Sequence, residues 1–173
     1  SVGTWTYTTA CTNTEDKGLH GKTGTIEVVK NVSGNELTKH GRLAVSDSGK
    51  YLVQADGTPF FWLAETSWFA MGDRGDFETV FKPIVDQRSS EGYNVFQSIL
   101  WVSNVMDQLE LGNEGGMQWK GAIWRDINPE YWDWVEKRVQ YLVDSGMVPV
   151  LGFDWGGSLS ADNLEDYKRV VRY

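Results

Sequence analysis

The sequence predicts an α/β fold in which parallel strands alternate with helices. Short apolar runs at 59–64, 93–100 and 147–153 alternate with amphipathic stretches at helical spacing. Helix signals mark the ends of these stretches, such as Pro129 directly after Asn128. This alternation is typical of parallel sheets, because each helix returns the chain to the same end of the next strand.

The amino-terminal part carries a different pattern, that of antiparallel strands. Residues 5–8 alternate aromatic and hydroxyl side chains, and residues 25–29 are rich in β-branched side chains. Two or three strands make only a marginal structure on their own. We therefore expect residues 1–34 to be the end of a β-sandwich whose beginning lies upstream. A polar linker is expected at 35–41, and the alternating pattern occupies 42–173.

A hairpin and a buried strand are expected at the start of the alternating region. Residues 42–46 and 50–54 predict antiparallel strands joined by an Asp-Ser-Gly turn. A second turn follows at Asp56-Gly57. The apolar run 59–64 is short enough to be a strand buried on both faces, with Trp62 packed between strand and helix.

Three amphipathic helices are predicted, each with a recognisable beginning. Asp76 is the expected N-cap of the first, and Pro83 inside its pattern either kinks it or starts a second helix. The next helix begins after an Asn128 cap and ends at Gly146, and the last opens at Ser160.

Two architectures share this order of elements, the doubly wound sheet and the (β/α)8 barrel. Dinucleotide-binding sheets carry a glycine-rich phosphate loop after a strand. Here the segment 64–68, Ala-Glu-Thr-Ser-Trp, is acidic and aromatic instead. The pattern therefore favours the first part of a (β/α)8 barrel, about three βα units long.

Composition excludes several classes of function. The net charge of −8 disfavours nucleic acid as a partner. The single cysteine, Cys11, excludes an internal disulfide and a cysteine-cluster metal site, and we expect no metal and no cofactor. No apolar run approaches the ~18–20 residues that cross a bilayer, so membrane insertion is not expected. His20 and His40 precede the barrel part, which excludes a Ser-His-Asp triad there.

Polar side chains and tryptophans follow each of the three predicted strands. The carboxyl ends of barrel strands face the active site. Flat aromatic rings cover the C–H face of a sugar while polar groups bind its hydroxyls, so this combination predicts a carbohydrate cleft. The strand-end positions are Glu65, Thr66 and Trp68, then Gln97 or Ser98 and Trp101, then Asp154, Trp155, Gly156 and Gly157.

The two carboxylates among them also have structural interpretations. Glu65 is placed to form a buried ion pair with Arg74 or Arg88. Asp154 is placed to cap the segment that follows it through backbone amides, beginning with that of Trp155. Both interpretations remain open beside the sugar-binding one.

Several short motifs resemble the apiosidase-like glycoside hydrolases. Residues 56–68, DGTPFFWLAETSW, are similar to the opening barrel strand of that family, whose pattern is roughly DGxPFFWLGDTxW. Residues 1–32 resemble the last strands of the immunoglobulin-like domain that often precedes this barrel. Residues 92–97 are similar to the second strand of the family's barrel. Residues 128–132, 144–147 and 153–156 resemble its second helix and third strand, and residues 172–173 resemble the end of its third helix.

The resemblance implies a (β/α)8 glycosidase that degrades polysaccharide side chains with two carboxylates. By matching position, its substrate-site residues are Glu65, Thr66, Trp68, Gln97, Trp101, Asp154 and Trp155, with Glu65 standing where the family usually has Asp. In the family the catalytic groups follow later strands. We therefore expect the catalytic pair beyond residue 173 and assign no catalytic residue here.

Partners and location follow from the same resemblance. The expected ligand is an oligo- or polysaccharide, and the remainder of the barrel is a possible second fragment to which this chain binds. The chain alone is expected to be inactive, and the protein is expected to be secreted, periplasmic or on the cell surface. The alternatives are a non-catalytic carbohydrate-binding protein with the same aromatic cleft and a structural or adhesion module.

Overall fold

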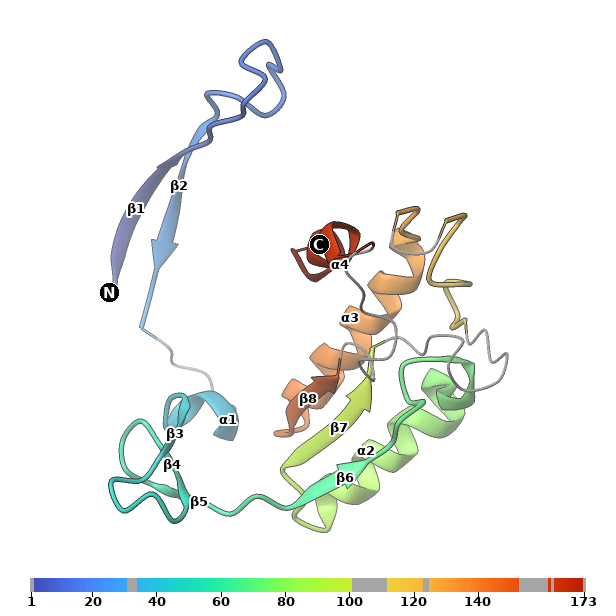
Figure 1. Ribbon diagram of the computed structural model, residues 1–173. Helices are drawn as coiled ribbons and strands as arrows, with labels where there is room; N and C mark the ends of the chain where they lie inside the picture. The colour runs from blue at the N-terminus through green and yellow to red at the C-terminus, as the bar shows by residue number, and fades with distance from the viewer. Residues whose placement is uncertain are drawn as a thin grey trace. The chain divides into compact units, whose positions relative to one another are not determined.

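The fold is mixed α/β and divides into two compact units, residues 1–34 and 35–173 (Figure 1). The structure is a computed structural model that describes residues 2–30, 34–100, 112–122, 125–152, 162 and 164–172. None of the helices in these ranges combines the length and the apolar character needed to cross a membrane.

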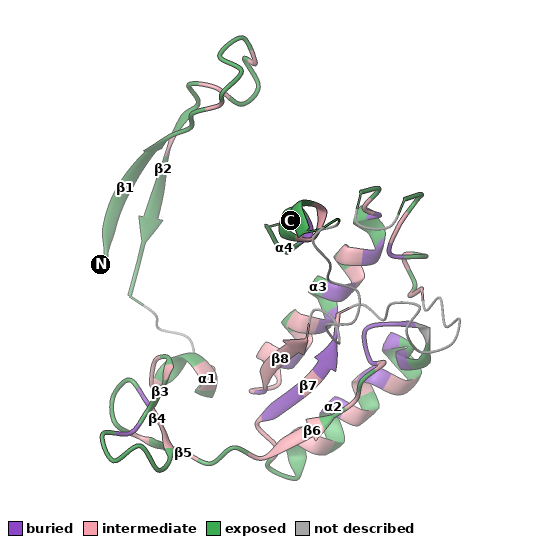
Figure 2. Ribbon diagram, viewed as in Figure 1, coloured by how far each residue is buried: buried purple, intermediate pink, exposed green. Residues whose placement is uncertain are grey.

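The first unit contains a two-stranded antiparallel hairpin. β1 (Gly3–Thr8) pairs with β2 (Thr23–Val28), and Trp5 lies opposite Ile26. Side chains alternate between faces along a strand, so Trp5, Tyr7 and Ile26 share one apolar face, and all three are exposed (Figure 2). Both predicted strands are confirmed, whereas their place in a β-sandwich stays a prediction.

A short helix occupies the segment expected to be a linker. α1 (Glu36–Lys39) begins after Asn35, whose side chain accepts a hydrogen bond from the Leu37 amide and donates one to the Val143 carbonyl at 2.6 Å. The segment therefore groups with the second unit. A single turn shows no hydrophobic period, which is why the pattern of 35–41 did not reveal it.

An antiparallel sheet of three short strands follows α1. β3 (Leu43–Val45), β4 (Leu52–Gln54) and β5 (Pro59–Phe60) pair in that order. Gly49 and Gly57 stand in the two connecting turns with φ of 70° and 89°, a left-handed backbone that favours glycine. The hairpin and the second turn are both as predicted.

Asp56 in the second turn is bonded to two neighbours. Its carboxylate accepts a hydrogen bond from the Thr58 amide at 3.0 Å and lies 2.6 Å from Nδ1 of His40. These two hydrogen bonds, the Thr58 amide first, lower the pKa of Asp56 from 3.8 to about 2.

Asp56→Asn is expected to flatten the acid dependence of unfolding. The folded protein binds the Asp56 proton more weakly than the unfolded chain, so the stabilisation is complete above pH 3.8 and is lost as the pH falls to about 2. Urea midpoints measured by circular dichroism between pH about 2 and about 5 test this. Asp47→Asn, in the neighbouring turn, is the matched control. If the urea midpoint of Asp56→Asn depends on pH as steeply as that of the unsubstituted protein, the prediction is contradicted.

The predicted buried strand at 59–64 is wrong, because two sheets share these residues. Pro59 and Phe60 pair with β4, and the parallel sheet begins only at Ala64. Between them, Phe61 is 78% and Trp62 45% exposed, so Trp62 does not pack between strand and helix.

The physical reason for this division is the side chain of Asn94. Its Oδ1 accepts a hydrogen bond from the Leu63 amide at 3.1 Å, and its Nδ2 donates to the Phe61 carbonyl at 2.7 Å. These bonds satisfy backbone groups that a sheet partner would otherwise satisfy. The chain can therefore leave one sheet and enter the next without a continuous strand.

The parallel sheet confirms the predicted α/β class. β6 (Ala64–Thr66), β7 (Val95–Ile99) and β8 (Val148–Gly152) pair in that order, both pairs parallel. Gly92 and Gly146, with φ of 88° and 77°, end the helices that precede β7 and β8.

The first predicted helix consists of two helical segments, and a short helical turn precedes its Asp76 cap. A 3-10 turn, η1 (Asp73–Gly75), and a π-helical turn, η2 (Phe77–Phe81), lead into α2 (Lys82–Ser90). The Asp76 side chain accepts a hydrogen bond from a backbone amide of η2 at 2.9 Å, which confirms the predicted cap. Pro83 stands in the first turn of α2, which continues from η2 without a break because Phe81 and Lys82 both have right-handed helical backbone angles, so no separate helix starts at Pro83.

The last two helices are α3 (Pro129–Asp144) and α4 (Leu164–Arg172). Asn128 stands at the N-cap position of α3, but its side chain does not cap the helix as predicted. Its Nδ2 instead donates to the carbonyls of Gly115 and Met117, which holds the preceding loop. The predicted start of α4 at Ser160 lies outside the described residues.

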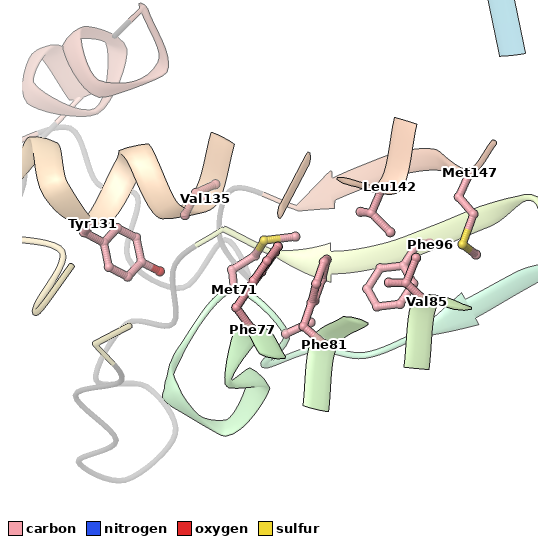
Figure 3. Close-up of a cluster of buried hydrophobic side chains, with 10 residues drawn as sticks. Met71, Phe77, Phe81, Val85, Phe96, Tyr131, Val135, Leu142 and Met147 are labelled. Carbon is pink, nitrogen blue, oxygen red and sulfur yellow. The ribbon is translucent and has the colours of Figure 1, made fainter. Parts of the chain in front are cut away.

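The main core lies between the parallel sheet and the helices α2 and α3 (Figure 3). Phe96 of β7 meets Phe81 from the first helical region edge to face, with ring centroids 5.8 Å apart. The α3 stripe contributes Tyr131, Val135 and Leu142, as its spacing predicted. The buried members of the core are Ala70, Met71, Phe77, Phe81, Val85, Phe96, Tyr131, Val135, Leu142 and Met147.

Candidate substrate-binding site

The carboxyl ends of β6 and β7 meet at one edge of the parallel sheet. Thr66, the last residue of β6, is the register partner of Gln97. The pairing extends past the strand, because the Ser67 amide donates to the Gln97 carbonyl at 2.9 Å and the Ile99 amide donates to the Trp68 carbonyl at 3.3 Å. The structure thus brings three of the predicted site residues, Thr66, Trp68 and Gln97, to the same edge.

These three residues present the chemistry that a sugar requires. Trp68 is 36% exposed, Thr66 is exposed and Gln97 is partly buried. Thr66 and Gln97 lie on one face of the sheet, where a hydroxyl and an amide together provide hydrogen-bond donors and acceptors. An exposed indole adds a flat apolar surface at this edge.

Glu65 lies on the opposite face of the sheet, toward the helices. Its register partner is Phe96, whose buried ring packs against Phe81. Register partners share a face, so the Glu65 side chain is directed at the helix layer. There its Oε2 accepts a hydrogen bond from Arg88 Nε of α2 at 2.5 Å. The geometry favours the ion-pair interpretation of Glu65 over sugar binding.

Arg88 is held by two carboxylates. Its Nη1 donates to Glu91 Oε2 at 2.8 Å, in addition to its bond with Glu65. The hydrogen bond to Glu91, followed by that to Glu65, raises the pKa of Arg88. Glu65 is therefore paired with a permanent cation.

The other predicted site residues cannot be placed. Trp101, Asp154 and Trp155 lie outside the described residues, so both interpretations of Asp154 remain predictions. Across the part of the chain that the structure describes, no group of three or more His, Cys, Asp or Glu side chains is arranged to hold a metal ion.

Sequence reasoning missed an ion pair that joins the loops after β6 and β7. The guanidinium of Arg138, on α3, is fully buried, and its Nη2 lies 2.9 and 2.7 Å from the two carboxylate oxygens of Glu114. Arg138 also donates to the carbonyls of Ala70 and Gly75, both at 3.0 Å. A signal was available, because Arg138 follows Val135 by three positions on the buried face of α3.

Glu114 in turn contacts the start of a helix. Its Oε1 accepts a hydrogen bond from the amide of Phe77, the first residue of η2, at 2.7 Å. Desolvation opposes ionisation of Glu114, but hydrogen bonds from its own amide, from Arg138 and from Phe77 outweigh it and lower its pKa. Glu114 therefore carries its charge where the two loops and α3 meet.

A cavity of about 470 Å³ lies beside α3 and α4, where Leu100, directly after β7, and Leu151, near the end of β8, also line it. Leu151 of β8 reaches it from the helix-covered face of the sheet, since its register partner Ser98 shares that face with Phe96. Its lining is mostly apolar, and Asp133 and Glu136 are its two charged residues. The residues that line it are Leu100, Trp132, Asp133, Val135, Glu136, Val139, Leu151, Val170 and Val171.

Residues 46–172 match a family model described as "Apiosidase-like, catalytic domain". The match covers most of the second unit, including β4, β5 and the parallel sheet, whereas β3 ends directly before it. Comparison with curated proteins found no match.

Solved structures of glycoside hydrolases are similar to the chain. One, named a glycoside hydrolase, is 25% identical with a TM-score of 0.59, over 76% of this chain and 31% of that one. A family 5 glycoside hydrolase from Bacteroides vulgatus ATCC 8482 is 27% identical with a TM-score of 0.52, over 65% of this chain and 24% of that one.

A third structure, a candidate glycoside hydrolase from the same organism, resembles the chain in fold. It is 18% identical with a TM-score of 0.66, and the likeness covers 100% of this chain and 35% of that one. The chain thus spans about a third or less of the length of the solved structures that it matches.

Proposed function

The chain belongs to the apiosidase-like family of catalytic domains, and on this premise we propose that it is part of a glycosidase acting on side chains of oligo- or polysaccharides. The observation that carries the proposal is the edge formed by Thr66, Trp68 and Gln97, where an indole and hydrogen-bonding groups lie together. Trp68 stacks on the sugar ring, and the two polar side chains bind its hydroxyls.

The proposed mechanism uses two carboxylates. One protonates the leaving oxygen, and the other attacks the anomeric carbon or activates water. Among the described residues, β6 and β7 place no carboxylate on the face that carries Thr66 and Gln97, because Glu65 points the other way. We therefore propose that the catalytic pair lies outside these 173 residues, and the greater length of the solved relatives supports this.

The same proposal gives each unit a place in a larger protein. β6, β7 and β8 with their helices form the beginning of a (β/α)8 barrel in this proposal, which rests on their parallel order and on the architecture that the family resemblance implies. The hairpin β1–β2 belongs to an immunoglobulin-like sandwich, in which the face carrying Trp5 and Ile26 is covered. A secreted, periplasmic or cell-surface location suits a polysaccharide substrate.

A non-catalytic carbohydrate-binding protein is the second candidate. The observation that favours it is the same absence of a carboxylate beside Thr66 and Gln97 within the described part of β6 and β7. Such a protein uses the aromatic edge for binding alone.

A hydrolysis screen separates the two candidates. The full-length protein is incubated with a panel of polysaccharides and side-chain oligosaccharides, apiose-containing ones included, and released sugars are measured. We expect hydrolysis by the full-length protein and none by the 173-residue chain. Binding without hydrolysis by the full-length protein favours the second candidate, and hydrolysis by the short chain alone contradicts the placement of the catalytic pair.

Trp68→Ala in the full-length protein is expected to raise KM about tenfold with little change in kcat, because it removes ground-state stacking. Trp62→Ala is the matched control, since Trp62 is 45% exposed but stands before β6 rather than after it. We expect its KM to equal that of the unsubstituted protein. Equal KM values for the two variants contradict the assignment of the site to the carboxyl edge.

A further inference from the structure

Both ends of the turn that follows Trp68 are hydrogen-bonded to one side chain, that of Arg138. Hydrogen bonds from the Ala70 amide to the Ser67 carbonyl and from the Gly75 amide to the Gly72 carbonyl shape this turn. A Cβ on Gly75 would lie 2.6 Å from the Ala70 carbonyl oxygen, so the two ends of the turn are in close contact. The carbonyls of these two ends are the ones that Arg138 binds.

The loop 112–118 is attached to the same turn. Glu114 binds Arg138 directly, and the Asn113 side chain donates to the carbonyls of Met71 and Tyr131 at 3.3 and 3.0 Å. A Cβ on Gly115 would lie 2.0 Å from the Glu130 carbonyl oxygen, so this loop lies directly against the start of α3. The turn 69–76 and the loop 112–118 therefore share one support.

Aromatic rings surround this support and keep water out. The Arg138 guanidinium lies 5.6 Å from the ring centres of Phe77 and Phe81 and 5.9 Å from that of Trp134. Contacts of a cation with ring faces gain strength when the site is desolvated. The planar guanidinium also binds several acceptors in fixed directions, which an ammonium group cannot do.

We propose that Arg138, together with Glu114, is a positioning pair that sets the orientation of Trp68 in the substrate-binding edge. The proposal rests on the proposed function. The pair touches no sugar: it fixes both ends of the turn 70–75, and the chain leading into that turn carries Trp68, whose carbonyl is bonded to β7. A tryptophan whose backbone is held on both sides in this way is preorganised for stacking.

Arg138→Lys in the full-length protein tests the proposal. Lysine keeps the charge but lacks the planar guanidinium whose N–H groups bind Ala70, Gly75 and Glu114 together. We expect KM to rise about tenfold with kcat within about twofold, and no further rise when Trp68 is already alanine. Amide hydrogen exchange at 69–76 and 112–118 is expected to accelerate about tenfold.

Two variants accompany this experiment. Lys137→Met is the matched control, because Lys137 neighbours Arg138 on α3 and lies 3.9 Å from the Trp134 ring centre. It is expected to leave KM and the exchange of both loops unchanged. Glu114→Gln leaves Arg138 in place, so it is expected to shift KM and exchange in the same direction by a smaller factor. It provides the readout if Arg138→Lys does not fold.

The outcomes are separable. Unchanged exchange in both loops overturns the proposal whatever the hydrolysis assay shows. Accelerated exchange with additive effects of Arg138→Lys and Trp68→Ala on KM also overturns it, because Arg138 would then be structural only. If the unsubstituted protein neither hydrolyses nor binds any saccharide, that result alone counts against the proposed function, and hydrogen exchange still decides whether Arg138 orders the turn after Trp68.

Discussion

Arg138→Met is expected to lower the free energy of unfolding by about 3–5 kcal/mol, since breaking a buried ion pair leaves charges and polar groups without partners. The side chain of Arg138 is 0% exposed and that of Glu114 is 24% exposed, so the carboxylate left behind is only partly hydrated. The carbonyls of Ala70 and Gly75 lose their Arg138 hydrogen bonds as well.

A double-mutant cycle measures this loss. Urea unfolding of Arg138→Met, Glu114→Met and the double variant is followed by circular dichroism. The double variant is expected to recover part of the loss, because it removes both charges and leaves apolar side chains among Phe77, Phe81 and Trp134. Arg125→Met serves as a control in an exposed ion pair and is expected to have a far smaller effect. If Arg125→Met and Arg138→Met lower the free energy of unfolding equally, the prediction is contradicted.

Phe81→Ala is expected to lower the free energy of unfolding by about 3–5 kcal/mol, because it leaves a cavity in the core. Phe81 is 1% exposed, meets Phe96 edge to face and stacks on Phe77, with both pairs of ring centroids 5.8 Å apart. The neighbours belong to a strand and a helical turn, which cannot close the gap without moving the backbone.

Phe61→Ala is the matched control for this substitution. Phe61 is 78% exposed, so the same change in chemistry leaves no cavity. Its effect on the free energy of unfolding is expected to stay within about 0.5 kcal/mol. Denaturant midpoints of both variants provide the comparison, and a loss at Phe61 comparable to that at Phe81 places the core elsewhere.

Most elements with local signals were predicted correctly from the sequence, although the side chain of Asn128 does not cap α3. The Asp76 cap, the glycine at 146 and the apolar stripe of α3 each depend on residues a few positions apart. The parallel order of β6, β7 and β8 followed from the alternation of such elements.

The division of 59–64 required contacts that the sequence does not display. An uninterrupted apolar run carries no period, so nothing in it distinguishes one strand from two. The start of β6 decides which face each side chain occupies, because a shift of one residue exchanges the faces. Thr66 and Gln97 are register partners and lie at one edge of the sheet, as predicted. Glu65, the neighbour of Thr66, lies on the other face with Arg88, and the sequence did not show which face it would occupy.

The support of the candidate site had one local signal, the position of Arg138 in the stripe of α3, but no signal for its partner Glu114. Arg138 and Glu114 are 24 residues apart, and an arginine in a helical stripe is more often on the surface than in the core. Its burial is favourable where two loops meet α3, because the carbonyls of Ala70 and Gly75 and the Glu114 carboxylate accept hydrogen bonds from its Nε and Nη2.

The bonds of Asn94 also impose an order on folding. β3, β4 and β5 pair across short turns, so their sheet forms from contacts that are near in sequence. Asn94 instead joins Leu63 and Phe61 across 31 and 33 residues, and its carbonyl accepts a hydrogen bond from the amide of Val148, further still along the chain. Closing loops of this length is the slow step in building a parallel sheet. We therefore expect the edge that carries Thr66 and Gln97 to be among the last parts of the second unit to form during folding.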